Sequence, residues 1–151
     1  MRAKTARLGV AERGQLVLID TSIWIEALRP DGFASCREAV ARFAAAGRAA
    51  TCDVVLTEVL RGARNESQAR EWAHGLLALR VLSADGLGVV AARIGRAVRE
   101  AGASPPLGDL LIAAVALRHG AVVLHRDRHL HKIAATIGIE DIVPTDAPSH
   151  A

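Results

Sequence analysis

The sequence predicts an α/β fold in which a central, mostly parallel sheet is covered by helices on both faces. Short apolar runs rich in β-branched residues alternate along the chain with longer segments whose apolar residues recur at helical spacing. This alternation is typical of three-layer α/β/α domains. The 151 residues, 51% of them hydrophobic, suffice for one domain with a continuous core, and no repeat or internal linker divides them.

The first third of the chain contains two predicted strands and two predicted helices. Residues 16–19 are apolar and bounded by polar residues, which suits a strand buried on both faces. A helix is predicted over Thr21–Leu28 and, after a turn at residues 30–32, a second one over residues 34–47, whose final glycine suits a C-cap. The short run of residues 48–52 is the next predicted strand.

The middle of the chain repeats the order of strand and helix. Asp53 is a candidate N-cap for a helix over residues 54–64. Another amphipathic helix is predicted over residues 67–79, and a short strand follows at Arg80–Leu82. A longer helix over residues 86–102 has a glycine at its end, as helices often do.

The last third contains one clear strand between two helices. Pro105 and Pro106 precede a helical run that ends near residue 120, which favours a helix start directly after them. Residues 121–125 are the predicted strand. The last predicted helix covers residues 127–138, before the segment of residues 139–144.

Composition and the chain ends give further expectations. We expect residues 1–14 to form a flexible extension, residues 15–145 the domain and residues 146–151 a flexible tail. No apolar run is long enough to cross a membrane, and the basic N-terminal segment lacks the apolar centre of a secretory signal, so we expect a cytoplasmic protein. Cys36 and Cys52 fit neither a disulfide framework nor a CxxC pair and are interpreted as core residues.

Four acidic residues are expected at one edge of the sheet. Asp20 and Asp127 each follow a predicted strand, whereas Glu58 and Asp109 lie on helices in apolar surroundings. Ligand sites of open α/β sheets gather at the carboxyl ends of the strands. Buried carboxylates are unfavourable unless they are paired or bind a cation, and oxygen ligands without a cysteine cluster favour Mg²⁺ or Mn²⁺. Such ions suit phosphodiester hydrolysis.

Each acid also has an ordinary structural explanation. Asp20 and Asp127 could be helix N-caps, and Asp109 could be an acid of a first helical turn that the helix dipole favours. Glu58 could pair along its helix with Arg61 or Arg64. Individually none of the four is decisive, so the interpretation depends on their joint spacing.

The chain resembles the PIN-domain ribonucleases and, within them, the VapC-type toxins of bacterial toxin–antitoxin pairs. Three segments carry the resemblance, and they occur in order at family-like spacing over residues 15–144. They are VLIDTSIWIEALR with the first acid, TEVLRGAR with the second, and LGDLLIAAVALRHGAVVLHRD with the third and fourth.

The resemblance implies a three-layer PIN-like fold and a metal-dependent endoribonuclease. It implies that Asp20, Glu58, Asp109 and Asp127 bind Mg²⁺, for which Mn²⁺ can substitute, and that Ser22 supports this shell. The implied reaction is hydrolysis of cellular RNA by a metal-activated water, leaving a 5′-phosphate and a 3′-hydroxyl. It also implies a homodimer and an antitoxin protein that covers the acidic cleft.

The histidines leave open how many metal ions the site binds and which metal it binds. His129 stands where many family members have a second acid two positions after the fourth, so the site could hold one metal or two. His129 could instead contact phosphate or face solvent. His125, His129 and His131 also allow a zinc hypothesis, which the lack of a nearby cysteine or an HExxH pattern weakens.

A basic segment at residues 118–132 supports a polyanionic substrate. Its alternative is a solvated helix face, and the aromatic share of 3% limits recognition of RNA by base stacking. The candidate RNA contacts are Arg126, Arg128, His129 and Lys132.

Other functions remain open at this point. A housekeeping RNA-processing nuclease has the same chemistry, and a non-catalytic RNA-binding module the same fold. A phosphatase of the aspartyl-phosphate type also begins with an Asp after a strand. It normally has a second acid two residues on, where this chain has Ser22, and no matching lysine segment is present.

Overall fold

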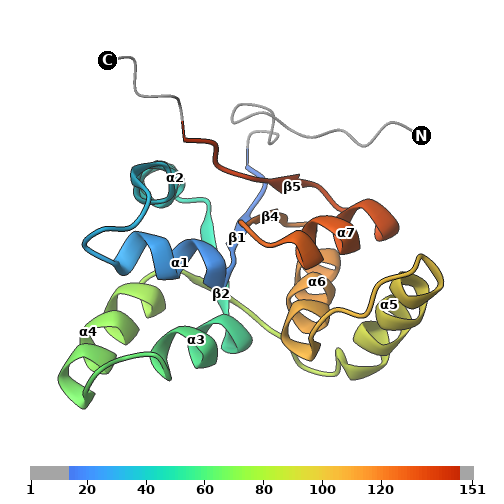
Figure 1. Cartoon of the computed structure of the whole chain (residues 1–151). Coiled ribbons are helices and arrows are strands. Elements are labelled where there is room, and N and C mark those ends of the chain that lie inside the picture. Colours follow the sequence, from blue (N-terminus) through green and yellow to red (C-terminus); the bar gives the residue numbers. More distant parts are fainter. Residues whose placement is uncertain (1–13, 147–151) are drawn as a thin grey trace.

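A five-stranded sheet, parallel throughout, forms the centre of the protein, and its strand order is β3-β2-β1-β4-β5 (Figure 1). The structure is a computed structural model that describes residues 14–146. The extension expected at residues 1–14 and the tail expected at residues 146–151 therefore lie almost entirely outside the described residues. The strands are β1 (Val17–Ile19), β2 (Ala49–Cys52), β3 (Arg80–Leu82), β4 (Val122–Leu124) and β5 (Asp141–Ile142).

Two groups of helices cover the two faces of the sheet, and Figure 1 shows them on opposite sides of it. Helix α1 contacts α2 and α3, and α3 contacts α4, whereas α5, α6 and α7 contact one another. The three-layer prediction is therefore confirmed. The helices are α1 (Thr21–Leu28), α2 (Ala34–Ala45), α3 (Asp53–Leu60), α4 (Glu66–Leu77), α5 (Gly88–Glu100), α6 (Leu107–His119) and α7 (Arg128–Ile137).

The chain reverses its direction across the sheet at its centre. From β1 it proceeds to β2 and β3, and it then returns past β1 to β4 and β5. Because crossovers between parallel strands are right-handed, this reversal puts the later helices on the opposite face. It also puts the carboxyl ends of β1 and β4 side by side, at the position where such sheets bind ligands.

The apolar runs of the sequence form the core. Every residue of β1, β2 and β4 is buried, as the near-continuous apolar character of these strands predicts for a sheet covered on both faces. Cys36 and Cys52 are both buried in this core, which confirms their interpretation. Among the helices of the described part of the chain, none has the length and apolarity needed to span a membrane.

Most predicted elements occur within a few residues of their expected bounds. Two differences matter. Asp53 is the first residue of α3, and Cys52 occupies the N-cap without a side-chain hydrogen bond. The two-residue strand β5 was not predicted, because the segment IEDIVP is too short and too acidic to reveal a strand until it pairs with β4.

The turn between α1 and α2 requires a glycine. A Cβ atom at Gly32 would lie 1.8 Å from the backbone oxygen of Glu26, whereas one at Gly75 in α4 would have nothing within 4 Å. We expect Gly32→Ala to lower the free energy of unfolding by about 1–3 kcal/mol through overpacking. The matched variant Gly75→Ala should raise it by about 0.5–1 kcal/mol. Urea denaturation measures both, and equal effects of the two changes would contradict this account.

Candidate active site

Asp20 lies at the carboxyl end of β1 and caps α1. Its Oδ2 atom accepts hydrogen bonds from the backbone N–H of Ser22 at 2.9 Å and from the Ser22 hydroxyl at 2.6 Å. The residue is only 3% exposed. Burial raises the pKa of Asp20 from its usual value, and the hydrogen bonds from Ser22 offset this only in part. Asp20 thus caps α1, as the sequence indicated it could. Its burial nevertheless disfavours the charged form of the carboxylate.

Ser22 links the ends of the two central strands. Its hydroxyl oxygen donates to Asp20 and accepts the backbone N–H of Arg126 at 2.9 Å. The backbone N–H of Asp20 also donates to the carbonyl oxygen of Leu124, the last residue of β4. The segment after β1 and the segment after β4 are therefore joined side by side.

Glu58 reaches this region from α3. Its Oε1 atom accepts a hydrogen bond from the Thr21 hydroxyl at 3.0 Å, which ties α3 to the start of α1. A Cβ atom at Gly108 would lie 3.4 Å from Oε2, so the absence of a side chain there lets α6 begin directly beside the carboxylate. Glu58 does not take part in any ion pair among the described residues, so the pairing considered with Arg61 or Arg64 does not form.

Asp109 lies in the first turn of α6 and faces the other three acids. Burial and the neighbouring charges of Asp127, Asp20 and Glu58 raise its pKa to about 7. Its Oδ2 atom is buried and has no hydrogen-bond partner among the described residues. Asp109 is thus within electrostatic reach of Asp127, Asp20 and Glu58, although burial is the largest cause of its raised pKa. No three of the four acids present ligand oxygens within 4.8 Å of one another.

Asp127 caps the last helix, α7. Its Oδ1 atom accepts the backbone N–H of His129 at 2.6 Å and that of Leu130 at 3.3 Å. The side chain of Asp127 is thereby held at the helix start, where the helix dipole favours a negative charge. Two of the four acids, Asp20 and Asp127, are therefore N-caps as well as members of the acidic cluster.

The donor set suits a hard divalent cation. Four carboxylates come from four different segments, Oδ2 of Asp109 is buried without a partner among the described residues, and burial together with the neighbouring charges of the other three disfavours its ionised form. Carboxylate oxygens are the ligands that Mg²⁺ and Mn²⁺ prefer. The residues present fit such an ion.

A second group of potential metal ligands lies next to Asp127. His125, His131 and Asp141 present ligand atoms within 4.8 Å of one another. Both histidines lie 2.8 Å from Oδ2 of Asp141, and although burial raises the pKa of Asp141, the hydrogen bonds from His125 and His131 outweigh it and lower that pKa overall. His129, the third residue of the zinc hypothesis, is not part of this group.

Hydrogen bonding argues against a metal at this second cluster. The backbone N–H of Asp127 donates to Nδ1 of His125, so the proton of the neutral ring resides on Nε2 and is donated to Asp141. A protonated ring nitrogen has no lone pair for a metal. Sequence analysis missed Asp141, since only its pairing in β5 brings it to His125.

The candidate RNA contacts differ in their surroundings. Arg128 and Lys132 are exposed on α7, and His129 is half-buried. Arg126 instead stacks its guanidinium over the Phe33 ring at 4.0 Å and pairs with Asp146 at 3.5 Å. Asp146, assigned above to the flexible tail, also accepts a hydrogen bond from Ser35. A cavity of about 320 Å³ beside Asp127 is lined by His125, Arg126, Asp127, Arg128, His131, Val143 and Pro144.

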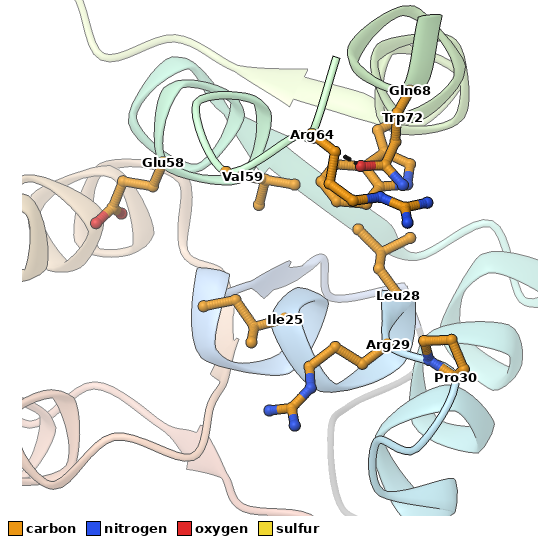
Figure 2. Close-up of a pocket in the computed structure, with 10 residues that line it drawn as sticks. Ile25, Leu28, Arg29, Pro30, Glu58, Val59, Arg64, Gln68 and Trp72 are labelled. Carbon is orange, nitrogen blue, oxygen red and sulfur yellow. Dashed lines mark hydrogen bonds between the residues drawn. The ribbon is translucent and has the colours of Figure 1, made fainter.

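A larger and mainly apolar groove of about 490 Å³ begins at Glu58. It lies between α1, the end of α3 and α4, and Figure 2 shows the Glu58 carboxylate at one end, turned away from the apolar side chains. Ile25, at its centre, is 49% exposed. The groove is lined by Ile25, Leu28, Arg29, Pro30, Glu58, Val59, Gly62, Arg64, Gln68 and Trp72.

Comparison with known proteins identifies the family. The PIN domain family model matches residues 17–136. A VapC ribonuclease of Mycobacterium bovis and Ribonuclease VapC11 of Mycobacterium tuberculosis are each 37% identical over 131 residues, which cover 83% of this chain and 96% of theirs. Ribonuclease VapC51 of Mycobacterium tuberculosis is 35% identical, over 80% of this chain and 87% of its own.

Solved structures with much lower sequence identity share the fold. VapBC2 from Rickettsia felis, bound to a DNA fragment from its promoter, aligns with a TM-score of 0.71 at 16% identity, over 87% of this chain and 100% of that one. FitAB bound to a DNA fragment aligns with a TM-score of 0.69 at 17% identity, over 90% and 100%. Family model, relatives and fold agree, and the chain therefore belongs to the PIN domain family, among the VapC ribonucleases.

Proposed function

We propose that this protein is a metal-dependent endoribonuclease and the toxin of a toxin–antitoxin pair. The observation that carries the proposal is the setting of Asp109, whose pKa is raised to about 7 and whose Oδ2 atom is buried without a partner among the described residues. Such a carboxylate, facing three others, favours a divalent cation. The relatives at 37% identity are ribonucleases, which supports RNA as the substrate.

Each of the four acids would have its own role in binding the ion or its water. A bound Mg²⁺ or Mn²⁺ would activate a water and offset the charge that develops on the scissile phosphate. Asp20 and Asp109 are the proposed principal ligands. Glu58 would help to hold the ion or its water, and Asp127 a second ion or the water network. Ser22 orients Asp20 through its 2.6 Å hydrogen bond.

The rim beside Asp127 would attract the RNA backbone. Exposed Arg128 and Lys132 on α7, with half-buried His129, are proposed to contact phosphates. The guanidinium of Arg126 lines the adjacent cavity although it is stacked on Phe33, so its proposed contact is with phosphate at the cavity mouth. Cleavage would leave a 5′-phosphate and a 3′-hydroxyl.

The apolar groove supports an inhibitory protein partner. A partner with an amphipathic helix could bury its apolar side chains against Ile25, Leu28 and Trp72 while a basic residue reached Glu58. Solved relatives of this fold include a toxin–antitoxin complex from Klebsiella pneumoniae, 20% identical with a TM-score of 0.67, over 87% of this chain and 99% of that one. We propose an antitoxin for this groove, together with a homodimer and a cytoplasmic location.

The acids should be essential for cleavage. We expect Asp20→Asn and Asp109→Asn to lower the rate of RNA cleavage by roughly 100-fold or more, beyond the 10–100-fold typical of residues that only support metal ligands. EDTA should abolish cleavage by the wild type. The assay incubates total RNA with Mg²⁺ or Mn²⁺. Asp53→Asn is the matched control, because Asp53 also follows a strand of this sheet but is exposed. Cleavage that survives EDTA and both substitutions rules out the metal mechanism.

Without metal, the stability of the protein should fall as pH rises. The pKa of Asp109 is about 7 in the folded protein and 3.8 in its ordinary state, so between these values the folded protein binds a proton that the unfolded chain has lost. The contribution of this proton to the free energy of unfolding is fully present below pH 3.8 and is lost as pH rises through about 7. We expect the Tm in EDTA to fall from pH 5 to pH 8 in the wild type and clearly less in Asp109→Asn.

Mn²⁺ should reverse this loss. At pH 8 it should raise the Tm of the wild type, because a ligand that binds only the folded state stabilises it, and should do so much less for Asp109→Asn. Thermal unfolding followed by circular dichroism measures both effects. Identical pH profiles of the two proteins would show that Asp109 is not the repelled carboxylate.

A toxin should stop growth when it is expressed alone. We expect wild-type expression to arrest growth, Asp109→Asn to be harmless, and a small protein encoded beside this chain to restore growth. Ile25→Glu should weaken that restoration, because it puts a charge in the apolar groove. Colony counts measure all four effects. Normal growth with active wild-type protein would instead favour the housekeeping RNA-processing nuclease, and a protein inactive on RNA would favour the non-catalytic module.

A further inference from the structure

The segment between β4 and α7, residues 125–127, has all three of its backbone N–H groups engaged. That of His125 donates to the carbonyl oxygen of Ile142 at 3.0 Å, that of Arg126 to the Ser22 hydroxyl at 2.9 Å, and that of Asp127 to Nδ1 of His125 at 3.0 Å. The segment that carries the fourth acid is therefore held by β5, by α1 and by a histidine ring.

The His125 ring is fixed at both of its nitrogen atoms. It is only 1% exposed, and its Nε2 atom lies 2.8 Å from Oδ2 of Asp141. Because Nδ1 accepts the N–H of Asp127, the ring proton resides on Nε2 and is donated to Asp141. The carboxylate thereby selects the tautomer in which Nδ1 can accept.

Asp141 is itself anchored by the sheet. It lies in β5, where it pairs with Val123 of β4, so its position relative to the end of β4 is set by strand pairing. His131 contacts the same Oδ2 atom at 2.8 Å from α7. The connection from the sheet to Asp127 thus runs through two side chains, Asp141 and His125.

We propose that His125, oriented by Asp141, is a positioning residue that fixes the backbone of Asp127 and so directs its carboxylate toward the other three acids. This inference rests on the proposed function, since Asp127 is there one of the metal-binding acids. The Asp127 carboxylate accepts the N–H groups of His129 and Leu130, so a shift of its backbone would move the carboxylate and the start of α7 together. Hydrogen bonds behind metal ligands set ligand orientation in this way.

Two substitutions of His125 each keep one of the two hydrogen bonds of its ring and remove the other. In His125→Asn the amide oxygen takes the place of Nδ1 and can still accept the N–H of Asp127, but the side chain no longer reaches Asp141. In His125→Gln the amide nitrogen takes the place of Nε2 and can still donate to Asp141, but the acceptor for Asp127 is lost. His131→Ala is the control, because it leaves both hydrogen bonds of His125 in place.

The measurements are Mn²⁺ affinity by titration calorimetry, kcat and KM for RNA cleavage, and Tm. We expect His125→Gln to lower Mn²⁺ affinity and kcat by about 10–100-fold, as residues behind metal ligands typically do. KM for RNA should be unchanged, since His125 acts on an acid and not on the RNA. His125→Asn should lose clearly less Mn²⁺ affinity and kcat than His125→Gln, because it keeps the acceptor for Asp127 and loses only the orientation by Asp141. His131→Ala should match the wild type.

Each alternative outcome has a distinct meaning. Equal losses in the Asn and Gln variants, or losses that follow Tm, would overturn the inference by showing that His125 only supports the fold. Wild-type affinity in His125→Gln combined with weak binding in Asp127→Asn would overturn it while leaving the proposed function intact. A wild type that neither binds Mn²⁺ nor cleaves RNA would overturn both.

Discussion

The burial of carboxylates at the carboxyl edge of the sheet, above all those of Asp20 and Asp109, is the constraint on which the rest of this structure depends. Three of the four acids are held in place by hydrogen bonds. Asp20 and Asp127 accept backbone N–H groups at helix starts, and Glu58 accepts the hydroxyl of Thr21. Of these four acids, only Asp109 has a buried oxygen without a partner among the described residues, and burial, followed by the charges of the other three acids, raises its pKa to about 7. The folding energy of the surrounding core must offset the free energy that burying these acids costs.

The topology of the sheet brings these acids to one edge. Reversal of the chain direction at the centre puts β1 beside β4, and one hydroxyl, that of Ser22, then joins the segments that follow both strands. In the same arrangement, the hydrogen bonds of Asp141 and His125 connect the edge strand β5 with the backbone of Asp127. His125 is therefore buried and hydrogen-bonded at both ring nitrogens, whereas the side chains of Arg128 and Lys132 are exposed on α7.

Glu58 connects the acidic cluster with the apolar groove. Its hydrogen bond to Thr21 faces the cluster, while the groove begins on its other side and extends toward Trp72 (Figure 2). A protein that fills the groove thus ends beside the acids, so that inhibition and catalysis would compete for one edge of the sheet. The fold itself tolerates wide divergence, since solved structures at 16–17% identity align over nearly the whole chain. The fold by itself therefore does not specify the function, which depends on individual side chains.

The sequence by itself determined the layer architecture and most elements, because apolar periodicity is a local property that tertiary contacts did not override. It also singled out the four acids as a predicted site. It also indicated that Asp20 and Asp127 could cap helices. Only the tertiary structure decided that Glu58 bonds to Thr21 and not to an arginine of its own helix, that Arg126 stacks on Phe33, and that Asp141 meets His125. These contacts join residues far apart in the chain. A two-residue strand such as β5 has no periodicity of its own, and it exists because β4 offers it unpaired backbone groups.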